Sequence, residues 1–163
     1  MVGGLGVDIV EIERMRDALR RRPRLKERCF SAEERAYCDG RTRPEIHYAL
    51  RFAAKEAVLK ALGTGFSGMR FTDVEVVRDP KGRPTPRLSG RAAEVADELG
   101  VTEMHLSLSY THSTAVASAV AIVADPPQHE ADEQPSQLAS FKELRSMLDD
   151  IGPDEDPREE PEG

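Results

Sequence analysis

The sequence predicts an α+β fold in which an antiparallel sheet packs against helices. Residues 5–9 alternate in polarity with Leu5, Val7 and Ile9 on one face, a pattern that suits a half-buried strand. Residues 45–62 are rich in Ala, Leu, Lys and Glu and end at a Gly-Thr-Gly stop, as a helix does. Two further strand patterns, rich in apolar residues, cover residues 105–110 and 115–123.

The remaining elements of the first half follow from local signals. Residues 4–12 are expected to run from the first strand into a helix, and residues 15–25 are helical in pattern although they are crowded with arginine. Ser31 and Glu34 stand at the spacing of a capping box, in which each side chain bonds the backbone of the other residue. We therefore expect a short helix here, ended by Gly40.

The second half contains a hairpin and another helix. Residues 71–78 alternate as a strand does, residues 79–82 (Asp-Pro-Lys-Gly) form a turn, and residues 84–88 return as a short strand. A helix is expected to begin at Ser89 and to end before Gly100.

Composition divides the chain into two parts. The net charge is −7 over 163 residues, but residues 125–163 hold thirteen acidic and three basic residues, a net charge of −10. Residues 1–124 therefore carry +3 and are interpreted as one folded domain. Residues 125–163 are expected to be mostly disordered, because they offer little apolar surface to offset chain entropy. Within them, residues 138–151 keep the apolar spacing of a short helix.

Several classes of protein are disfavoured. No run of eighteen apolar residues is present, so we expect no membrane span, and the N-terminus does not read as a secretory signal. Cys29 and Cys38 have no second pair, which argues against a disulfide framework or a zinc site and fits a cytoplasmic protein. Aromatic residues make up only 5% of the chain, which makes nucleic acid a weak candidate partner.

Glu56 stands out on the long central helix. An apolar stripe that includes Ala49 and Ala53 runs along this helix, and Glu56 and Lys60 fall at its centre. A buried carboxylate costs several kcal/mol unless it is paired or bound to a metal. Two interpretations remain open: a structural Glu56–Lys60 ion pair four residues apart, or a functional site.

Asp8 favours the functional interpretation. It follows a glycine-rich, apolar strand start, where an isolated aspartate is commonly only a cap or turn residue. Together with Glu56, however, it would offer the hard oxygen ligands that magnesium takes alongside substrate phosphates and waters. Lys60, one helical turn further on, would then contact the phosphates as a point charge. The glycine-rich segment 63–68 is either a helix stop or a phosphate-binding loop, and it is not a Walker motif.

Basic residues crowd the predicted helix near the N-terminus. A solvated helix face is the simplest interpretation, and an acidic helix of a partner protein is a second one. The cluster comprises Arg14, Arg16, Arg20, Arg21, Arg22, Arg24, Lys26 and Arg28.

Five segments, in their order and spacing, resemble the holo-acyl-carrier-protein synthases over residues 3 to about 124. The segments are Gly4-Leu-Gly-Val-Asp8-Ile-Val-Glu11-Ile, Phe30-Ser-Ala-Glu-Glu34, Arg51-Phe-Ala-Ala-Lys-Glu56-Ala-Val-Leu-Lys60-Ala-Leu-Gly63-Thr-Gly65, Gly82-Arg-Pro84 and His105-Leu-Ser-Leu-Ser109. The resemblance implies a 4'-phosphopantetheinyl transferase-like fold and a trimer with active sites between subunits. It also implies transfer of 4'-phosphopantetheine from coenzyme A to a serine of an apo acyl carrier protein, with release of adenosine 3',5'-bisphosphate.

The resemblance also implies roles for individual residues. Asp8 and Glu56 would bind Mg²⁺ and, with Lys60, would be catalytic. Coenzyme A would contact a larger set, namely Arg51, Lys60, Gly63, Thr64, Pro84, Ser109 and Tyr110. The acidic recognition helix of the carrier protein would contact Arg14, Arg20, Arg21 and Arg24. The acidic tail lies beyond the part of the chain that resembles the family. We expect it to fold back on the arginine-rich helix and compete with the carrier protein.

The chain departs from the family at Tyr110. Family members have Ser-His-Thr or Ser-His-Asp where this chain has Ser-Tyr-Thr. A tyrosine can hydrogen-bond a phosphate but is a poor base near neutral pH. His112, if the strand continues that far, would share a face with Tyr110 and is one alternative base; Glu34 and a metal-bound water are others. Two rival functions remain: a homologue that binds coenzyme A or carrier protein without transfer, and a metal-dependent phosphohydrolase.

Overall fold

The computed structural model describes residues 1–63 and 68–124 and confirms the α+β class. Strands β1, β5 and β4 form an antiparallel sheet in that order, and β2 pairs with β3 in a separate antiparallel hairpin. The elements in chain order are β1 (Val2–Glu11), α1 (Ile12–Arg21), α2 (Leu25–Cys29), α3 (Ala32–Asp39), α4 (Pro44–Ala61), the 3₁₀ turn η1 (Phe71–Asp73), β2 (Val74–Arg78), β3 (Pro84–Leu88), α5 (Gly90–Glu98), β4 (Val101–Tyr110) and β5 (Thr114–Val123).

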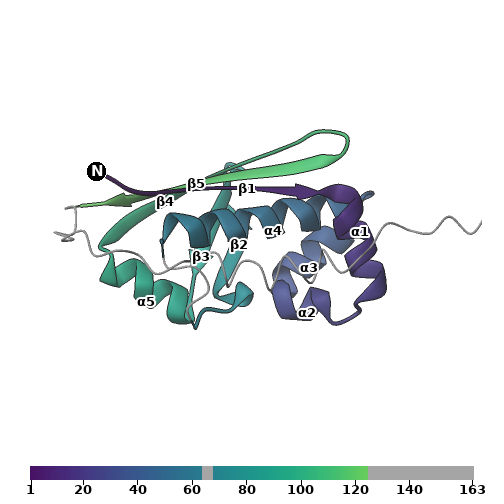
Figure 1. Cartoon of the computed structure of the whole chain (residues 1–163), viewed down its shortest axis with the longest axis horizontal. Coiled ribbons are helices and arrows are strands. Elements are labelled where there is room, and N and C mark those ends of the chain that lie inside the picture. The colour runs from purple at the N-terminus through teal and green to yellow at the C-terminus, as the bar shows by residue number, and fades with distance from the viewer. Residues whose placement is uncertain (64–67, 125–163) are drawn as a thin grey trace, which may run out of the picture.

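The long helix α4 lies along one face of the sheet, with the shorter helices grouped around it (Figure 1). Its backbone comes very close to β1, because a Cβ atom on Gly6 would lie 1.9 Å from the carbonyl oxygen of Ala57. A Cβ on Gly4 would meet the carbonyl oxygen of Ala61 at the same distance. Only glycine fits at these two positions, so the pair of glycines fixes how α4 crosses β1.

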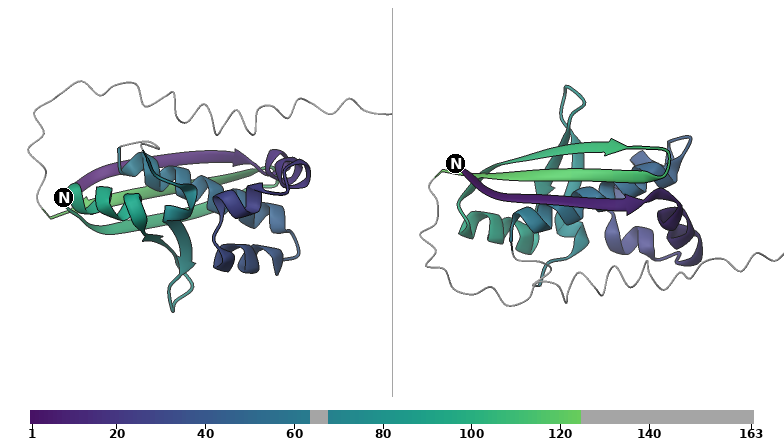
Figure 2. Two further views of the ribbon diagram at one scale, coloured as in Figure 1. Left: turned by 90° about the horizontal axis from the view of Figure 1, so that it is seen from below. Right: turned by 45° about the horizontal axis from the view of Figure 1, so that its top comes forward.

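The opposite face of the sheet is covered by no described helix, and Figure 2 shows its three strands side by side from that direction. Leu5, Val7 and Ile9 point to this face and are 65%, 48% and 51% exposed. The prediction of a half-buried strand is confirmed, but the face buried in the single chain is that of Gly6, Asp8 and Val10 rather than that of Leu5, Val7 and Ile9. The residues packed against α4 are those in between, since close packing there requires Gly6 rather than a bulky side chain.

The predicted helix over residues 15–25 is wrong at both ends. Helix α1 begins earlier, at Ile12, and ends at Arg21, and a separate short helix α2 follows. Pro23 explains the break: a proline disfavours helical geometry in the residue before it, and Arg22 has a non-helical backbone with φ −124° and ψ 84°.

Other predicted elements match closely. The capping box of Ser31 and Glu34 starts α3, and the hairpin, α5 and β5 occupy the expected positions, whereas β4 begins at Val101 rather than at His105. The strand predicted from Phe71 starts only at Val74, because residues 71–73 form a 3₁₀ turn. The predictions for residues 125–163, including the helix at 138–151, lie outside the described residues.

The two cysteines are unpaired and lie in the interior. Cys29 and Cys38 are free, buried thiols, and burial raises the pKa of each to about 11. Such thiols are unreactive at neutral pH. Among the described helices, none has the length and apolar character needed to cross a bilayer.

Candidate functional site

Asp8 and Lys60 meet where β1 crosses α4. Asp8 is 4% exposed and points to the α4 side of the sheet, where it follows Gly6 among the alternate residues of β1 on that face. The Lys60 ammonium group donates a hydrogen bond to Asp8 Oδ1 at 2.8 Å and another to the carbonyl oxygen of Val7 at 2.9 Å. The Lys60 side chain remains one-third exposed, so the pair lies at the edge of the core with one side open.

Glu56 lies one helical turn before Lys60 on α4 and is 2% exposed. The prediction that this carboxylate is buried is therefore confirmed. Lys60 forms an ion pair with Asp8, so this lysine also contacts a carboxylate outside its own helix. Asp8 and Lys60 thus join β1 to α4, and Glu56 is a second buried carboxylate one helical turn away on α4.

The donor set at this contact fits magnesium. Within residues 1–63 and 68–124, no group of three or more Asp, Glu, His or Cys side chains is placed to hold a metal ion. Asp8 and Glu56 each carry carboxylate oxygens, the hard ligands that magnesium takes together with waters and substrate phosphates. Magnesium sites in phosphate-handling proteins commonly have this composition.

A second ionic group, which the sequence reasoning missed, lies inside the helical layer. Lys55 and Glu34 form an ion pair of 2.7 Å, and both side chains have no exposed surface. Lys55 also donates to the carbonyl oxygens of Phe71 and Val74, at 3.0 and 2.5 Å. Desolvation is the main influence on Lys55 and lowers its pKa, while the adjacent carboxylate acts in the opposite direction.

Glu34 is committed to structural contacts. Besides Lys55, its carboxylate accepts from the backbone N–H groups of Ser31 and Val76, both at 2.9 Å. Glu34 therefore connects α3, α4 and β2, and it is 1% exposed. These structural contacts give its carboxylate a role that does not require it to act as a general base.

Lys55 was missed because the helix wheel places it beside the apolar stripe rather than on it. In the structure, every residue from Tyr48 to Leu59 is buried, so α4 has almost no solvent-facing side. The near-continuous apolar composition of this helix could have predicted that Lys55 is buried, because a helix that is apolar on all sides lies in the core of a protein.

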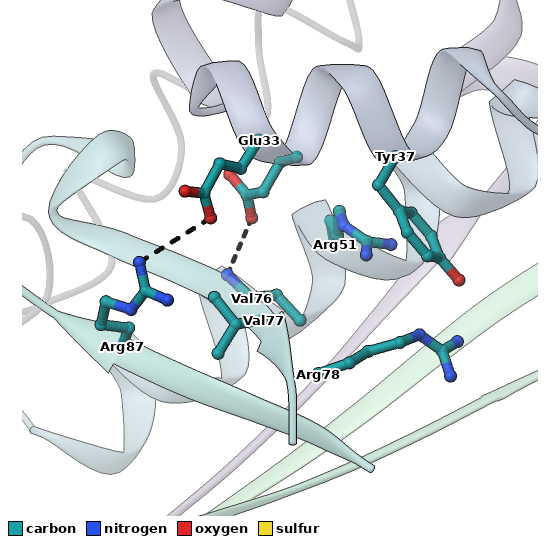
Figure 3. Close-up of a pocket in the computed structure, with 8 residues that line it drawn as sticks. Glu33, Tyr37, Arg51, Val76, Val77, Arg78 and Arg87 are labelled. Atoms are coloured by element: carbon teal, nitrogen blue, oxygen red, sulfur yellow. Dashed lines mark hydrogen bonds and ion pairs between the residues drawn. The ribbon is translucent and has the colours of Figure 1, made fainter. Parts of the chain in front are cut away.

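Arg51 lies in a pocket of about 250 Å³ between α3, α4 and the β2–β3 hairpin. Figure 3 shows Arg51, Tyr37 and Arg78 together on one side of this pocket. The Arg51 guanidinium carbon is 3.9 Å from the centroid of the Tyr37 ring, and those of Arg41 and Arg78 are 4.1 and 5.3 Å from the same centroid. The pocket lining comprises Glu33, Glu34, Tyr37, Arg51, Val76, Val77, Arg78 and Arg87.

Tyr37 and the guanidinium groups of Arg41, Arg51 and Arg78 together have the charge of an anion-binding site. Arg51 is 4% exposed, and its Nε has no hydrogen-bond partner among the described residues. His47 packs edge-on against Tyr37, and its pKa is lowered by burial and then by Arg51, Arg41 and Arg78. A buried guanidinium in a positive field needs a negatively charged partner, and a phosphate is the anion that best matches its geometry.

The other residues predicted to bind coenzyme A are spread around the molecule. Gly63 follows the C-cap of α4 with a positive φ of 72°, and Pro84 begins β3 opposite Arg78. Thr64 lies outside the described residues. Ser109 and Tyr110 are the exposed last residues of β4.

Tyr110 is 55% exposed and lies on the same side of the sheet as Asp8. It pairs with Ala115 on β5, and Asp8 pairs with Ala117, so the two side chains flank β5 two residues apart. The premise for His112 is wrong, because β4 ends at Tyr110 and residues 111–113 form a turn. His112 therefore does not continue the row of side chains to which Tyr110 belongs.

The predicted carrier-binding residues lie on α1 and at the start of α2, at the end of the molecule away from α5 (Figure 1). Arg20, Arg21 and Arg24 are exposed, and Arg14 is half-buried. Arg20 has a nearby carboxylate in Asp17, at 3.4 Å.

Comparisons with known proteins agree on one family. The profile of the 4'-phosphopantetheinyl transferase superfamily matches residues 4–119. The chain is 49% identical over 118 residues to the holo-[acyl-carrier-protein] synthase of Moorella thermoacetica, covering 72% of this chain and 91% of that protein. It is 45% identical over 122 residues to the same enzyme of Alkaliphilus metalliredigens, covering 74% and 99%.

A solved structure gives the same result. The crystal structure of a holo-(acyl-carrier-protein) synthase from Bacillus anthracis in complex with CoA (3',5'-ADP) matches with a TM-score of 0.63 at 34% identity. The match covers 76% of this chain and 99% of that one.

Proposed function

Because this chain belongs to the 4'-phosphopantetheinyl transferase superfamily, we propose that it transfers 4'-phosphopantetheine from coenzyme A to a serine of an apo acyl carrier protein. Adenosine 3',5'-bisphosphate is the second product. One observation carries the proposal: holo-[acyl-carrier-protein] synthases are 45–49% identical to this chain over nearly their whole length. The relatives are named for this activity, and one solved relative contains coenzyme A.

Asp8 and Glu56 would hold Mg²⁺ for this reaction. Both carboxylates are buried, Asp8 on β1 and Glu56 on α4, and an uncompensated buried charge would be costly. The metal, when bound, neutralises charge on the diphosphate and orients it for in-line displacement. The two side chains are held by elements whose relative position Gly6 fixes, which keeps their spacing constant.

Lys60 and Tyr110 would bind the diphosphate. Lys60 contacts Asp8 through an ammonium group that is one-third exposed, so it can turn toward a phosphate when coenzyme A arrives. Tyr110 offers a hydroxyl on the same side of the sheet as Asp8. The serine nucleophile belongs to the carrier protein, so no nucleophile is required in this chain, and Tyr110 is assigned a binding role rather than that of a base.

The nucleotide half of coenzyme A would take the pocket beside Tyr37. Arg51 supplies a buried guanidinium, and Arg41 and Arg78 add positive charge around the same ring. A nucleotide phosphate would satisfy these groups. Gly63, Thr64, Pro84 and Ser109 are assigned to the remainder of the coenzyme site on the basis of their family positions.

A homotrimer would cover the face of the sheet opposite α4, which no described helix covers. Leu5, Val7 and Ile9 form an apolar row on β1 at an edge of the sheet, where a single chain gains nothing from exposing them. On β5 the neighbouring outward residues include Val116 and Val120, which are half-buried. Three copies related by three-fold symmetry would bury this face and bring each active site next to a neighbouring subunit.

The basic residues of α1 and α2 would receive the carrier protein. A positively charged face steers an acidic helix and orients it without deep burial. The protein is proposed to act in the cytoplasm, in agreement with its two free thiols.

The proposal is tested by following the release of adenosine 3',5'-bisphosphate from coenzyme A by chromatography. We expect release only when magnesium and apo carrier protein are both present. A carrier whose acceptor serine is changed to alanine is the control and should give none. Release without carrier would indicate a phosphohydrolase, and no release under any condition would indicate a binding protein.

A further inference from the structure

The acidic segment 125–163 extends beyond the relatives. The Alkaliphilus enzyme is matched over 99% of its own length by only 74% of this chain, and the family profile ends at residue 119. The additional segment has thirteen acidic and three basic residues. The charge is densest in residues 149–162, with eight acidic residues and one basic residue.

The surface of α1 and α2 has the opposite charge. Residues 12–28 hold eight basic and three acidic residues, a net charge of +5. Arg24 and Arg28 are exposed and form no ion pair with any carboxylate in the described parts of the chain. These two helices therefore present positive charge that their own acidic residues do not neutralise.

We propose that residues 149–162 bind the basic surface of α1 and α2 on their own chain and compete there with the acyl carrier protein. The proposal rests on the carrier-binding role given to this surface above. An acidic segment of the same polypeptide would then set the affinity for the acidic partner.

The length of the connecting chain permits this contact. Val123 donates a backbone hydrogen bond to Met1, so β5 ends beside the start of β1, whereas α1 follows the other end of β1. The two ends of β1 are roughly 30 Å apart at about 3.3 Å per residue. The 24 residues from 125 to 148 reach roughly 80 Å when fully extended, so they cover this distance with ample slack.

Weak binding is sufficient when the competitor is tethered. Exposed ion pairs contribute little individually and are screened by salt. A tether of this kind gives an effective concentration on the order of 1 mM, so a dissociation constant of about 0.25 mM would raise the apparent KM for the carrier about fivefold. The effect should decrease as the ionic strength rises.

The first measurement compares the full chain with a variant in which the eight acidic residues of 149–162 are changed to their amides. We expect the KM for apo carrier protein to fall about fivefold at low salt, with kcat unchanged, and the difference to shrink at moderate salt. Equal KM values in the two chains at both salt concentrations would overturn the proposal.

The second measurement does not depend on activity. A fluorescent peptide of residues 149–162 is added to the amide variant, and its anisotropy is followed. We expect binding that is lost in Arg24→Glu and in Arg28→Glu but kept in Lys81→Glu, a matched charge reversal on the exposed β2–β3 turn. No binding, or equal binding to all variants, would overturn the proposal. Binding by a chain that modifies no carrier would instead show that the proposed function had failed.

Discussion

At the scale of single residues, the clearest prediction is a loss of activity when Glu56 is changed. Glu56→Gln keeps the shape of the side chain and removes the charge proposed to hold magnesium. Removal of a group that stabilises transition-state charge commonly costs on the order of 100-fold to 1000-fold in kcat, and we expect a loss of this size. The measurement is the rate of carrier modification at saturating substrates.

Glu94→Gln is the matched control for this variant, because Glu94 is an exposed glutamate on α5. It should leave the rate unchanged. If Glu56→Gln, shown to be folded, kept a rate within a few-fold of the unaltered chain, the metal-binding role of Glu56 would be wrong.

Tyr110 distinguishes binding from proton transfer. If its hydroxyl binds a phosphate, Tyr110→Phe should raise the KM for coenzyme A about tenfold, the equivalent of one hydrogen bond, with little change in kcat. Tyr110→His should keep activity. Its rate should also change with pH near the usual pKa of an imidazole, about 6.5. A large drop in kcat with unchanged KM in Tyr110→Phe would contradict the binding role.

The elements that carry the proposed site residues were predictable because their signals are local. Asp8 lies on a short strand, and Glu56 and Lys60 lie on one helix; the structure contains both elements, and the roles of the three residues stay a prediction. Tyr37 was not predicted, because its role depends on Arg41, Arg51 and Arg78 converging on one ring from three different segments. No local pattern contains that convergence.

At the scale of elements, the buried pair of Lys55 and Glu34 joins α3, α4 and β2. Lys55→Met should lower the free energy of unfolding by about 3–5 kcal/mol, since it leaves a buried carboxylate without its cation. Urea denaturation measures the change. The double variant Lys55→Met with Glu34→Gln should be more stable than Lys55→Met alone, because no buried charge remains.

Equal stability of the single and double variants would mean that the charge of Glu34 is solvated in some other way. An exposed ion pair provides the comparison: Arg91 and Glu98 on α5 lie 2.8 Å apart. Removing that pair should change the free energy of unfolding by less than about 1 kcal/mol.

Local signals predicted most elements, and the errors have identifiable causes. The end of α1 was readable from Pro23, whose steric effect on Arg22 is local. The orientation of β1 was not readable, because an alternating strand shows two faces and does not say which one meets the helix. The clash that a Cβ on Gly6 would make with α4 decides it, and that contact is tertiary.

At the scale of the whole molecule, the bare apolar face of the sheet leads to a prediction about assembly. Val7 lies in the middle of the outward row on β1. Val7→Lys should convert a trimer to a monomer, because it places a charge where three copies would bury apolar surface. Sedimentation velocity measures the change, and loss of carrier modification should accompany it if active sites lie between subunits.

Glu94→Lys, on α5 and away from this face, is the control and should remain trimeric. An unaltered chain that sediments as a monomer, or a Val7→Lys variant that sediments like the unaltered chain, would contradict the assembly. The sequence supplied the apolar residues of this face, but only the structure shows that α4 covers the other side.

The most direct test of the transferase activity is the intact mass of an apo acyl carrier protein after incubation with this chain, coenzyme A and magnesium. We predict a gain of one phosphopantetheine, with none in the presence of EDTA and none on a carrier that lacks its acceptor serine. An unchanged carrier mass, from both the unaltered chain and Tyr110→His while each is folded and binds coenzyme A, would contradict the account.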